Sequence, residues 1–188
     1  MHPVLAKAFD DGERLLHEFR SSEPEIAQVI QAISECFKAG GKLFTAGNGG
    51  SMADAMHVAE EFTGRFKKER PALPAIALAD PTHLTCVSND YGFEFVFSRP
   101  IEALGKPGDV VLLLTTSGNS ENLIKAAQSA RAKNCLVVGF LGKGGGKLNA
   151  LCDIAVIAPG ESSDRIQELH MFALHAIIEA VEIELGYE

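Results

Sequence analysis

The chain has 188 residues, which suits one domain with a substantial core, and 46% of its residues are hydrophobic. Its formal net charge of −8 at pH 7 argues against binding to nucleic acid, because phosphate backbones attract positive surfaces. No apolar run is long enough to span a bilayer, and charges are spread through residues 1–16, MHPVLAKAFDDGERLL, so neither a membrane segment nor a signal peptide is expected.

The beginning of the chain predicts two helices. In residues 4–19, apolar side chains form a stripe at helical spacing. In residues 21–41, Ser22 is followed three positions later by Glu25, which is the spacing of a capping box at a helix start, and a glycine pair ends the pattern. We therefore expect a helical pair over residues 1–40.

Short apolar runs then alternate with helical patterns. The runs are too short for helices and rich in strand-forming residues, and they cover 42–47, 74–79, 109–116, 135–142 and 153–159. The helical patterns cover about 51–66, 82–104 (broken), 120–133 and 162–186. Strands that are apolar on both faces and separated by helices indicate a parallel sheet covered on two sides. The sequence predicts an α/β fold, a three-layer αβα sandwich with a five-stranded parallel sheet.

This pattern predicts a single domain over residues 1–188. Residues 41–188 would form the sandwich and a long C-terminal helix, behind the helical pair of 1–40. In such sheets, ligands bind beyond the carboxyl ends of the strands, where the strand order reverses. The loops after the first and third strands, GNGGS and TTSGNS, are therefore the candidate binding loops.

The TTSGNS segment (115–120, here the hydroxyl loop) supplies four hydroxyl groups directly after a strand. They belong to Thr115, Thr116, Ser117 and Ser120, and Gly118 allows a tight turn. Free N–H groups at a helix start and hydroxyl donors can bind a dianion such as phosphate without a lysine. A helix capped by Ser120 is the plainer interpretation, but it leaves the other three hydroxyls unexplained.

The GNGGS segment (47–51, here the glycine loop) repeats this arrangement after the first strand. Gly49 and Gly50 permit close approach of a ligand to the backbone, and Ser51 is expected to cap the following helix. Asn48 is a candidate donor to a substrate hydroxyl. Both loops therefore predict a site for a small phosphorylated molecule.

A nucleotide cofactor is not expected. Neither G-x-G-x-x-G nor G-x-x-x-x-G-K-[ST] occurs in the chain. GKGGGK (142–147) comes nearest to the second pattern, but Leu148 stands where the hydroxyl residue is required. We interpret this segment as a mobile loop.

Two helices carry candidate acid/base residues. His57 and Glu61 are four residues apart, so they project from one helix face about 6 Å apart along its axis, whereas Glu60 points elsewhere. Such a pair is either functional or ordinary surface helix chemistry. In the last helix, His170 and His175 interrupt an apolar stripe, and a histidine in that setting is more often a core or interface residue.

The four cysteines have no C-x-x-C spacing. Cys135 and Cys152 lie in or beside apolar runs, which favours buried reduced thiols. Together with the absence of a signal peptide, this predicts a cytoplasmic protein.

The ordered combination of motifs resembles the phosphoheptose isomerases, a branch of the sugar isomerase (SIS) domain family. The motifs are GNGGS, DAMHVAEEFTGRF, RPALPAIAL, SNDYGFE, TTSGNS and DRIQELH, followed by a further histidine. The similarity covers nearly the whole chain, and it implies a flavodoxin-like SIS fold. It also implies interconversion of sedoheptulose 7-phosphate and D-glycero-D-manno-heptose 7-phosphate through an enediol, for bacterial heptose synthesis that leads to lipopolysaccharide or capsule.

The resemblance also implies roles for individual residues. Glu61 falls on the catalytic base and His175 on the acid. The zinc-associated positions are His57, Glu61, Gln167 and His175. The substrate-contacting positions are Asn48, Gly49, Gly50, Ser51, Glu61, Asn89, Asp90, Thr115, Thr116, Ser117, Ser120, Asp164 and Gln167. Members of the family are homotetramers with active sites at subunit interfaces.

Helix geometry qualifies the zinc prediction. Gln167 and His175 are eight residues apart, about 12 Å along an ideal helix, and glutamine is an unusual zinc ligand. The two side chains meet at one metal only if both reach inward, if the helix bends, or if they belong to different chains. Asp164 and Arg165 can equally be a helix cap and an ion pair.

Two alternatives to a heptose isomerase remain at this point. One is a non-enzymatic SIS regulator that binds a sugar phosphate, like the relative that associates with the bacterial replication initiator protein. It would need the hydroxyl loop but not the pair Glu61 and His175. The other is an isomerase of another sugar phosphate, because loop chemistry does not count substrate carbons.

Overall fold

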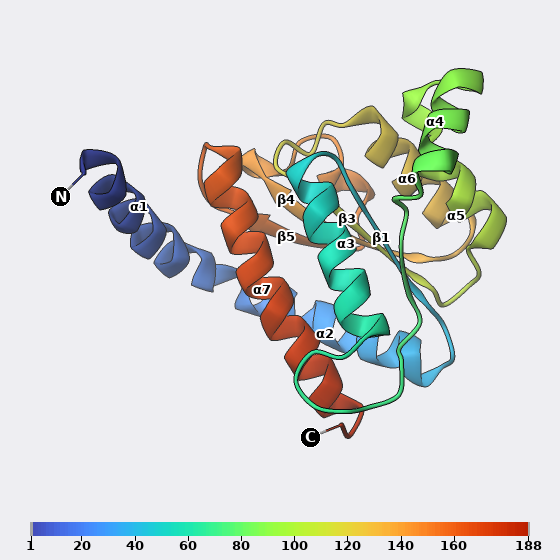
Figure 1. Ribbon diagram of the computed structural model, residues 1–188, viewed down its shortest axis with the longest axis horizontal. Coiled ribbons are helices and arrows are strands. Elements are labelled where there is room, and N and C mark those ends of the chain that lie inside the picture. The colour runs from blue at the N-terminus through green and yellow to red at the C-terminus, as the bar shows by residue number, and fades with distance from the viewer. Residues whose placement is uncertain (1, 188) are drawn as a thin grey trace.

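The computed structural model in Figure 1 describes residues 2–187, so the predicted domain limits at 1 and 188 fall outside the described residues. The helices are α1 (Pro3–Phe19), α2 (Glu23–Lys38), α3 (Gly50–Thr63), α4 (Pro81–Asp90), α5 (Ser98–Leu104), α6 (Glu121–Ala132) and α7 (Ser163–Glu184). The strands are β1 (Leu43–Gly47), β2 (Ala75–Ala77), β3 (Val110–Thr115), β4 (Leu136–Gly142) and β5 (Ile154–Ala158). Short 3₁₀ turns are η1 (Arg20–Ser22), η2 (Phe93–Phe95), η3 (Lys143–Gly145) and η4 (Asn149–Leu151).

The five strands form one parallel sheet in the order β2-β1-β3-β4-β5. The order reverses between β1 and β3, where Gly47, the last residue of β1, pairs with Leu114, one residue before the end of β3. The predicted α/β class and parallel five-stranded sheet are therefore confirmed. Because both strands end at the same edge, the glycine loop and the hydroxyl loop emerge side by side, as expected.

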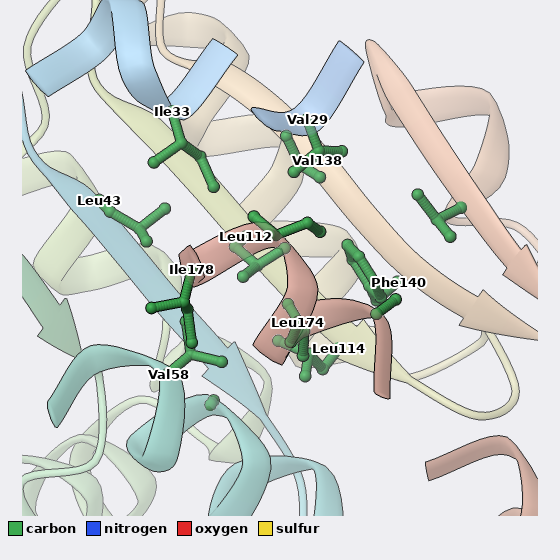
Figure 2. Close-up of a cluster of buried hydrophobic side chains, with 14 of the residues drawn as sticks. Val29, Ile33, Leu43, Val58, Leu112, Leu114, Val138, Phe140, Leu174 and Ile178 are labelled. Atoms are coloured by element: carbon green, nitrogen blue, oxygen red, sulfur yellow. The ribbon is translucent and has the colours of Figure 1, made fainter. Parts of the chain in front are cut away.

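Helices cover both faces of the sheet and make two cores. Along β3, Leu112 and Leu114 face α2, α3 and α7, whereas Val111 and Leu113 face the layer of α4, α5 and α6. Figure 2 shows the first core. Its labelled side chains are Val29, Ile33, Leu43, Val58, Leu112, Leu114, Val138, Phe140, Leu174 and Ile178. This alternation explains why the strands are apolar throughout.

The two N-terminal helices are joined by η1 and not by an open loop. The predicted capping box is wrong, since Ser22 makes no side-chain capping bond and its hydroxyl lies 3.5 Å from the carbonyl oxygen of Ile157, to which it donates. Phe19, Arg20 and Glu23 have helical backbone angles, whereas Ser22 departs from them at φ −88° and ψ 5°. The N–H of Glu23 donates to the carbonyl of Arg20, so the first N–H of α2 is already paired within the turn.

All four cysteines are free thiols. Cys135 is buried as predicted, and Cys152 is half-buried. Burial raises the pKa of the Cys36 thiol to about 11 and that of Cys152 to about 12, so both stay protonated at neutral pH. Within residues 2–187, no helix has the length and apolar character needed to cross a membrane.

Candidate active site

A cavity of about 240 Å³ opens where β1 and β3 end. It is lined by Asn48, Ser51, Leu114, Thr115, Thr116, Ser117, Ser120, Ser163 and Gln167. The structure thus brings together seven side chains that the sequence placed in the substrate site, from both loops and from α7. Ser163 was not foreseen, and its hydroxyl lies 3.0 Å from that of Thr116.

The hydroxyl loop is held by hydrogen bonds of its own. The Thr115 hydroxyl oxygen accepts from the N–H of Gly118 at 3.2 Å, and the Ser117 hydroxyl accepts from the N–H of Asn119 at 3.2 Å. Ser120 occupies the N-cap of α6, as predicted, but its side chain makes no capping bond. The Ser120 hydroxyl is therefore free to meet a ligand at the positive end of α6.

The GKGGGK segment, interpreted from sequence as a mobile loop, is anchored against the hydroxyl loop. The N–H of Leu148 donates to the carbonyl of Gly118 at 2.9 Å, and the N–H of Lys147 donates to the Asn119 side chain at 3.1 Å. Gly118 has a φ of +63°, and a Cβ added there would overlap the carbonyl group of Gly145. The close approach of the two backbones fixes the shape of the hydroxyl loop.

The glycine loop enters α3 earlier than expected. Gly49 is the N-cap, with a φ of +56°, and Ser51 is already the second helical residue. The prediction that Ser51 caps the helix is wrong because glycine lets the backbone turn into the helix two residues before it. Ser51 is buried, and its hydroxyl oxygen lies 3.4 Å from the side-chain nitrogen of Gln167.

Asn48 is paired with a residue that sequence reasoning missed. Its amide and that of Asn122 exchange two hydrogen bonds, of 3.0 and 2.8 Å. Asn122 is buried in the first turn of α6, so the pair ties the start of one binding loop to the helix that follows the other. In the sequence, Asn122 is one polar residue at the start of a predicted helix, and that pattern does not reveal its burial or its partner.

A second group of predicted residues meets between α3 and α7. The Nε2 of His57 lies 3.2 Å from an Oε1 of Glu61, and the rings of His57 and His175 meet edge to face with centroids 5.1 Å apart. Phe66 stacks on the other side of His175, at 5.7 Å. These three residues, His57, Glu61 and His175, are called the His–Glu cluster below.

Burial differs between the two acid/base residues of α3. The side chain of Glu61 is 17% exposed and that of His57 is 42% exposed, while Glu60 faces solvent as predicted. Glu61 is therefore mostly enclosed but keeps some contact with solvent.

The donor atoms of the His–Glu cluster suit a zinc ion. One ligand atom from each residue lies within 4.8 Å of the others. Two imidazoles and one carboxylate are a known donor set for catalytic zinc, which leaves the fourth position for water or substrate. All three come from one chain.

Gln167, the fourth predicted zinc ligand, lies two turns before His175 and faces the glycine loop. A Cβ added to Gly50 would lie 2.7 Å from the Gln167 amide. It lies in the cavity lining beside Ser51, among other side chains that the sequence analysis assigned to substrate contact. The role of Gln167 toward a metal stays a prediction.

The helices α3 and α7 run parallel and side by side (Figure 1). Ser51 meets Gln167 near their starts, and His57 meets His175 further along. The cavity and the His–Glu cluster therefore lie at two levels of one helix pair. From Ser51 to His57, six residues correspond to about 9 Å along the helix axis.

Three further predicted residues are not brought into the cavity lining. Asn89 and Asp90 are exposed at the end of α4, where the Asn89 amide donates to the Asp90 carboxylate at 2.8 Å. Asp164 is exposed in the first turn of α7 and pairs with Arg165 at 3.4 Å. Hydrogen bonds from Ser162 and from the Arg165 backbone hold the pKa of Asp164 below its usual value.

His170, by contrast, is a core residue. Its Nε2 lies 3.0 Å from the carbonyl oxygen of Leu141, and its side chain is wholly buried. Burial lowers the pKa of the ring to about 4. This histidine is neutral at physiological pH and lies outside the site.

Comparison with known proteins gives one consistent result. Residues 9–142 match the model of the SIS domain. The chain is 54% identical to the phosphoheptose isomerase of Fusobacterium nucleatum over 181 residues, which is 95% of this chain and 93% of that protein. The solved phosphoheptose isomerases of Neisseria gonorrhoeae and Francisella tularensis superpose with TM-scores of 0.90 and 0.92 at 36% and 34% identity. Each covers 95% of this chain, and the chain covers 97% and 96% of them. The chain belongs to the SIS domain family and, within it, to the phosphoheptose isomerases.

Proposed function

We propose that this protein interconverts sedoheptulose 7-phosphate and D-glycero-D-manno-heptose 7-phosphate, as a step of bacterial heptose synthesis. The observation that carries the proposal is the pairing of two sites along one helix pair in a chain 54% identical to a phosphoheptose isomerase. One site offers uncharged hydrogen-bond donors that can bind an anion, and the other offers an acid/base group.

The cavity is the proposed phosphate anchor. Its hydroxyls and the N–H groups at the start of α6 offer hydrogen bonds to a dianion. Holding the far end of the sugar fixes the position of the reacting carbons, which is the main contribution of an anchor to rate. Thr115, Thr116, Ser117 and Ser120 carry this role.

Glu61 is the proposed base. In the opened ketose, its carboxylate removes a proton from C1, which gives a cis-enediol, and returns the proton to C2, which gives the aldose. One carboxylate serves both carbons because they present the same face of the enediol. The half-buried position of Glu61 keeps it close to the sugar and partly shielded from water.

His175 is the proposed acid. During the shift, the carbonyl oxygen on C2 gains a proton and the hydroxyl on C1 loses one, and an imidazole near neutral pH can carry out both transfers. The ring of His175 is held between Phe66 and His57, so it keeps one orientation toward the sugar. A zinc ion bound by His57, Glu61 and His175 would supply polarisation of the sugar carbonyl.

The alternatives are less well supported. A non-enzymatic regulator needs the cavity but not the His–Glu cluster, and this chain has both. An isomerase of a shorter sugar phosphate is less well supported because the similar proteins, at 54% and 36% identity, are phosphoheptose isomerases. A cytoplasmic location stays a prediction.

The deciding experiment incubates the purified protein with sedoheptulose 7-phosphate, with and without a chelator, and detects the aldose by chromatography and mass spectrometry. Ribulose 5-phosphate and fructose 6-phosphate serve as shorter substrates. We expect the heptulose to be converted at least about 100-fold faster than either. Equal turnover of a shorter sugar would reject the assignment to heptose, and loss of activity with chelator would support a required metal.

We also propose that copies of the chain assemble, as a homotetramer with active sites at subunit interfaces. The helix α1 extends away from the rest of the molecule and carries exposed apolar side chains, including Phe9 at 76% exposure (Figure 1). A groove of about 490 Å³ beside it is lined by Leu16, Phe19, Ile26 and Phe172 among others. An apolar surface of this kind in a chain with a net charge of −8 favours contact with another protein surface.

A further inference from the structure

Arg70 is the most deeply buried cation of the described chain. Its side chain has no exposed area, and its Nε donates to a carboxylate oxygen of Glu182 at 2.6 Å, where Glu182 is 5% exposed. Taking both charges out of water is costly, and such a pair seldom adds net stability. Its contacts point to a role in positioning.

The guanidinium group of Arg70 holds the end of α3. Its two terminal nitrogens donate to the carbonyl oxygens of Glu61 at 2.7 Å and Phe62 at 2.8 Å, and more weakly to that of Gly64 at 3.2 Å. The last carbonyls of a helix lack partners within the helix, and a positive charge suits that end of its dipole. Arg70 therefore caps α3 from outside and contacts the backbone of Glu61 itself.

The partner carboxylate comes from the helix that carries His175. Glu182 follows His175 by seven residues, which is two turns of α7, so both lie on the same helix face about 10 Å apart along the axis. The fork of Arg70 thus joins the backbone of Glu61 to the helix of His175. Arg70 thus makes a third contact between the end of α3 and α7. The other two, Ser51 with Gln167 and His57 with His175, lie nearer the starts of the helices.

We propose that Arg70 and Glu182 are positioning residues that set the separation of the Glu61 carboxylate and the His175 ring. This inference rests on the function proposed above for those two side chains. Only arginine offers donors in a rigid fork that reaches a carboxylate and two carbonyls at once, whereas lysine offers a single nitrogen. A displacement of about 1 Å at an acid/base pair can cost about 100-fold in rate.

The test compares Arg70→Lys with two controls. Lys67→Met removes an exposed ion pair, Lys67 with Glu179 at 2.6 Å, which joins the same two segments without touching the carbonyls of α3. Ile101→Ala opens a cavity in the core on the other face of the sheet and supplies a variant of lowered stability. The variants are assayed well below their unfolding midpoints for kcat and KM with sedoheptulose 7-phosphate, and for affinity to Zn²⁺ by competition with a chromophoric chelator.

We expect Arg70→Lys to lower kcat about 10- to 100-fold while KM changes less than about threefold, and to weaken Zn²⁺ binding at least about tenfold. Lys67→Met and Ile101→Ala should keep both values within about twofold. If Arg70→Lys does not fold, Glu182→Gln, which keeps the shape but not the charge, should show the same split with a smaller loss of kcat.

Two results would overturn the inference. One is an Arg70→Lys variant whose kcat and Zn²⁺ affinity both stay within about twofold of the wild-type values. The other is a loss no greater than that of Ile101→Ala at an equal unfolding midpoint. A wild-type protein that does not convert the sugar, combined with weakened Zn²⁺ binding in Arg70→Lys, would reject the proposed function and leave the positioning role standing.

Discussion

His170 should make the stability of the protein fall below neutral pH. Its ring is wholly buried, Nε2 lies beside the carbonyl of Leu141, and Nδ1 has no hydrogen-bond partner among the described residues. Burial lowers the pKa of the folded form to about 4, whereas an unfolded histidine titrates near 6.5. Between these values the unfolded chain binds a proton that the folded chain does not, so stability present above about pH 6.5 is lost as the pH falls toward 4.

The size of the effect follows from the two pKa values. pH 5.0 lies about 1.5 units below the pKa of the unfolded histidine and above that of the folded one. At about 1.36 kcal/mol for each unit, protonation of the unfolded chain lowers the free energy of unfolding by about 2 kcal/mol. The replacement His170→Gln keeps a donor for the Leu141 carbonyl but does not titrate. Urea unfolding followed by circular dichroism at pH 7.5, 6.5 and 5.0, at one protein concentration, measures the difference between the two proteins.

We expect the stability of wild type relative to His170→Gln to drop by about 2 kcal/mol from pH 7.5 to pH 5.0. The contributions of the carboxylates and of the other histidines to the pH dependence cancel in this difference, because both proteins contain them. Parallel curves, with a difference that changes by less than about 0.5 kcal/mol, would show that His170 is not held neutral by burial.

Three further predictions concern the site and the assembly. Glu61→Gln should lower kcat at least about 1000-fold while the protein still binds the substrate, as measured by calorimetry, because the amide cannot take the proton from C1; near-normal turnover would remove Glu61 from the role of base. Ser120→Ala should raise KM about tenfold and change kcat less than about threefold, since a hydrogen bond to a charged phosphate is worth about 1.5–3 kcal/mol, and steady-state kinetics with the inverse pattern would place Ser120 near the reacting carbons. Phe9→Glu should convert the assembly into smaller species in light scattering at micromolar concentration, and an unchanged mass would exclude α1 from the interface.

The strands were predictable from sequence because burial on both faces leaves an unbroken apolar run. The run at 109–116 became Val110–Thr115, and that at 135–142 became Leu136–Gly142. Helix starts were less predictable, since a cap depends on what the preceding backbone does. Ser22 is the last residue of a 3₁₀ turn in which the carbonyl of Arg20 already accepts from the N–H of Glu23, and Ser51 follows glycines that enter the helix first.

The site was predictable in its parts but not in its arrangement. Helical spacing alone put His57 and Glu61 on one face, and the cavity loops follow from the parallel sheet. That His175 joins them depends on α7 lying parallel to α3, which no local pattern encodes. Arg70 lies in a charged stretch, FKKER, whose composition gives no sign that one of its cations is buried.

The make-up of the cavity has a consequence for how substrate arrives. Among the described residues that line it there is no lysine or arginine, and the whole chain carries a formal charge of −8. A doubly charged sugar phosphate is therefore repelled at long range and attracted only on contact. Dissolved ions screen that repulsion over about 10 Å at 0.1 M, so encounters become more frequent as ionic strength rises, the reverse of electrostatic steering. The hydrogen bonds from the uncharged donors act at short range and depend far less on salt. The association rate of the substrate should therefore change with ionic strength more than its dissociation rate.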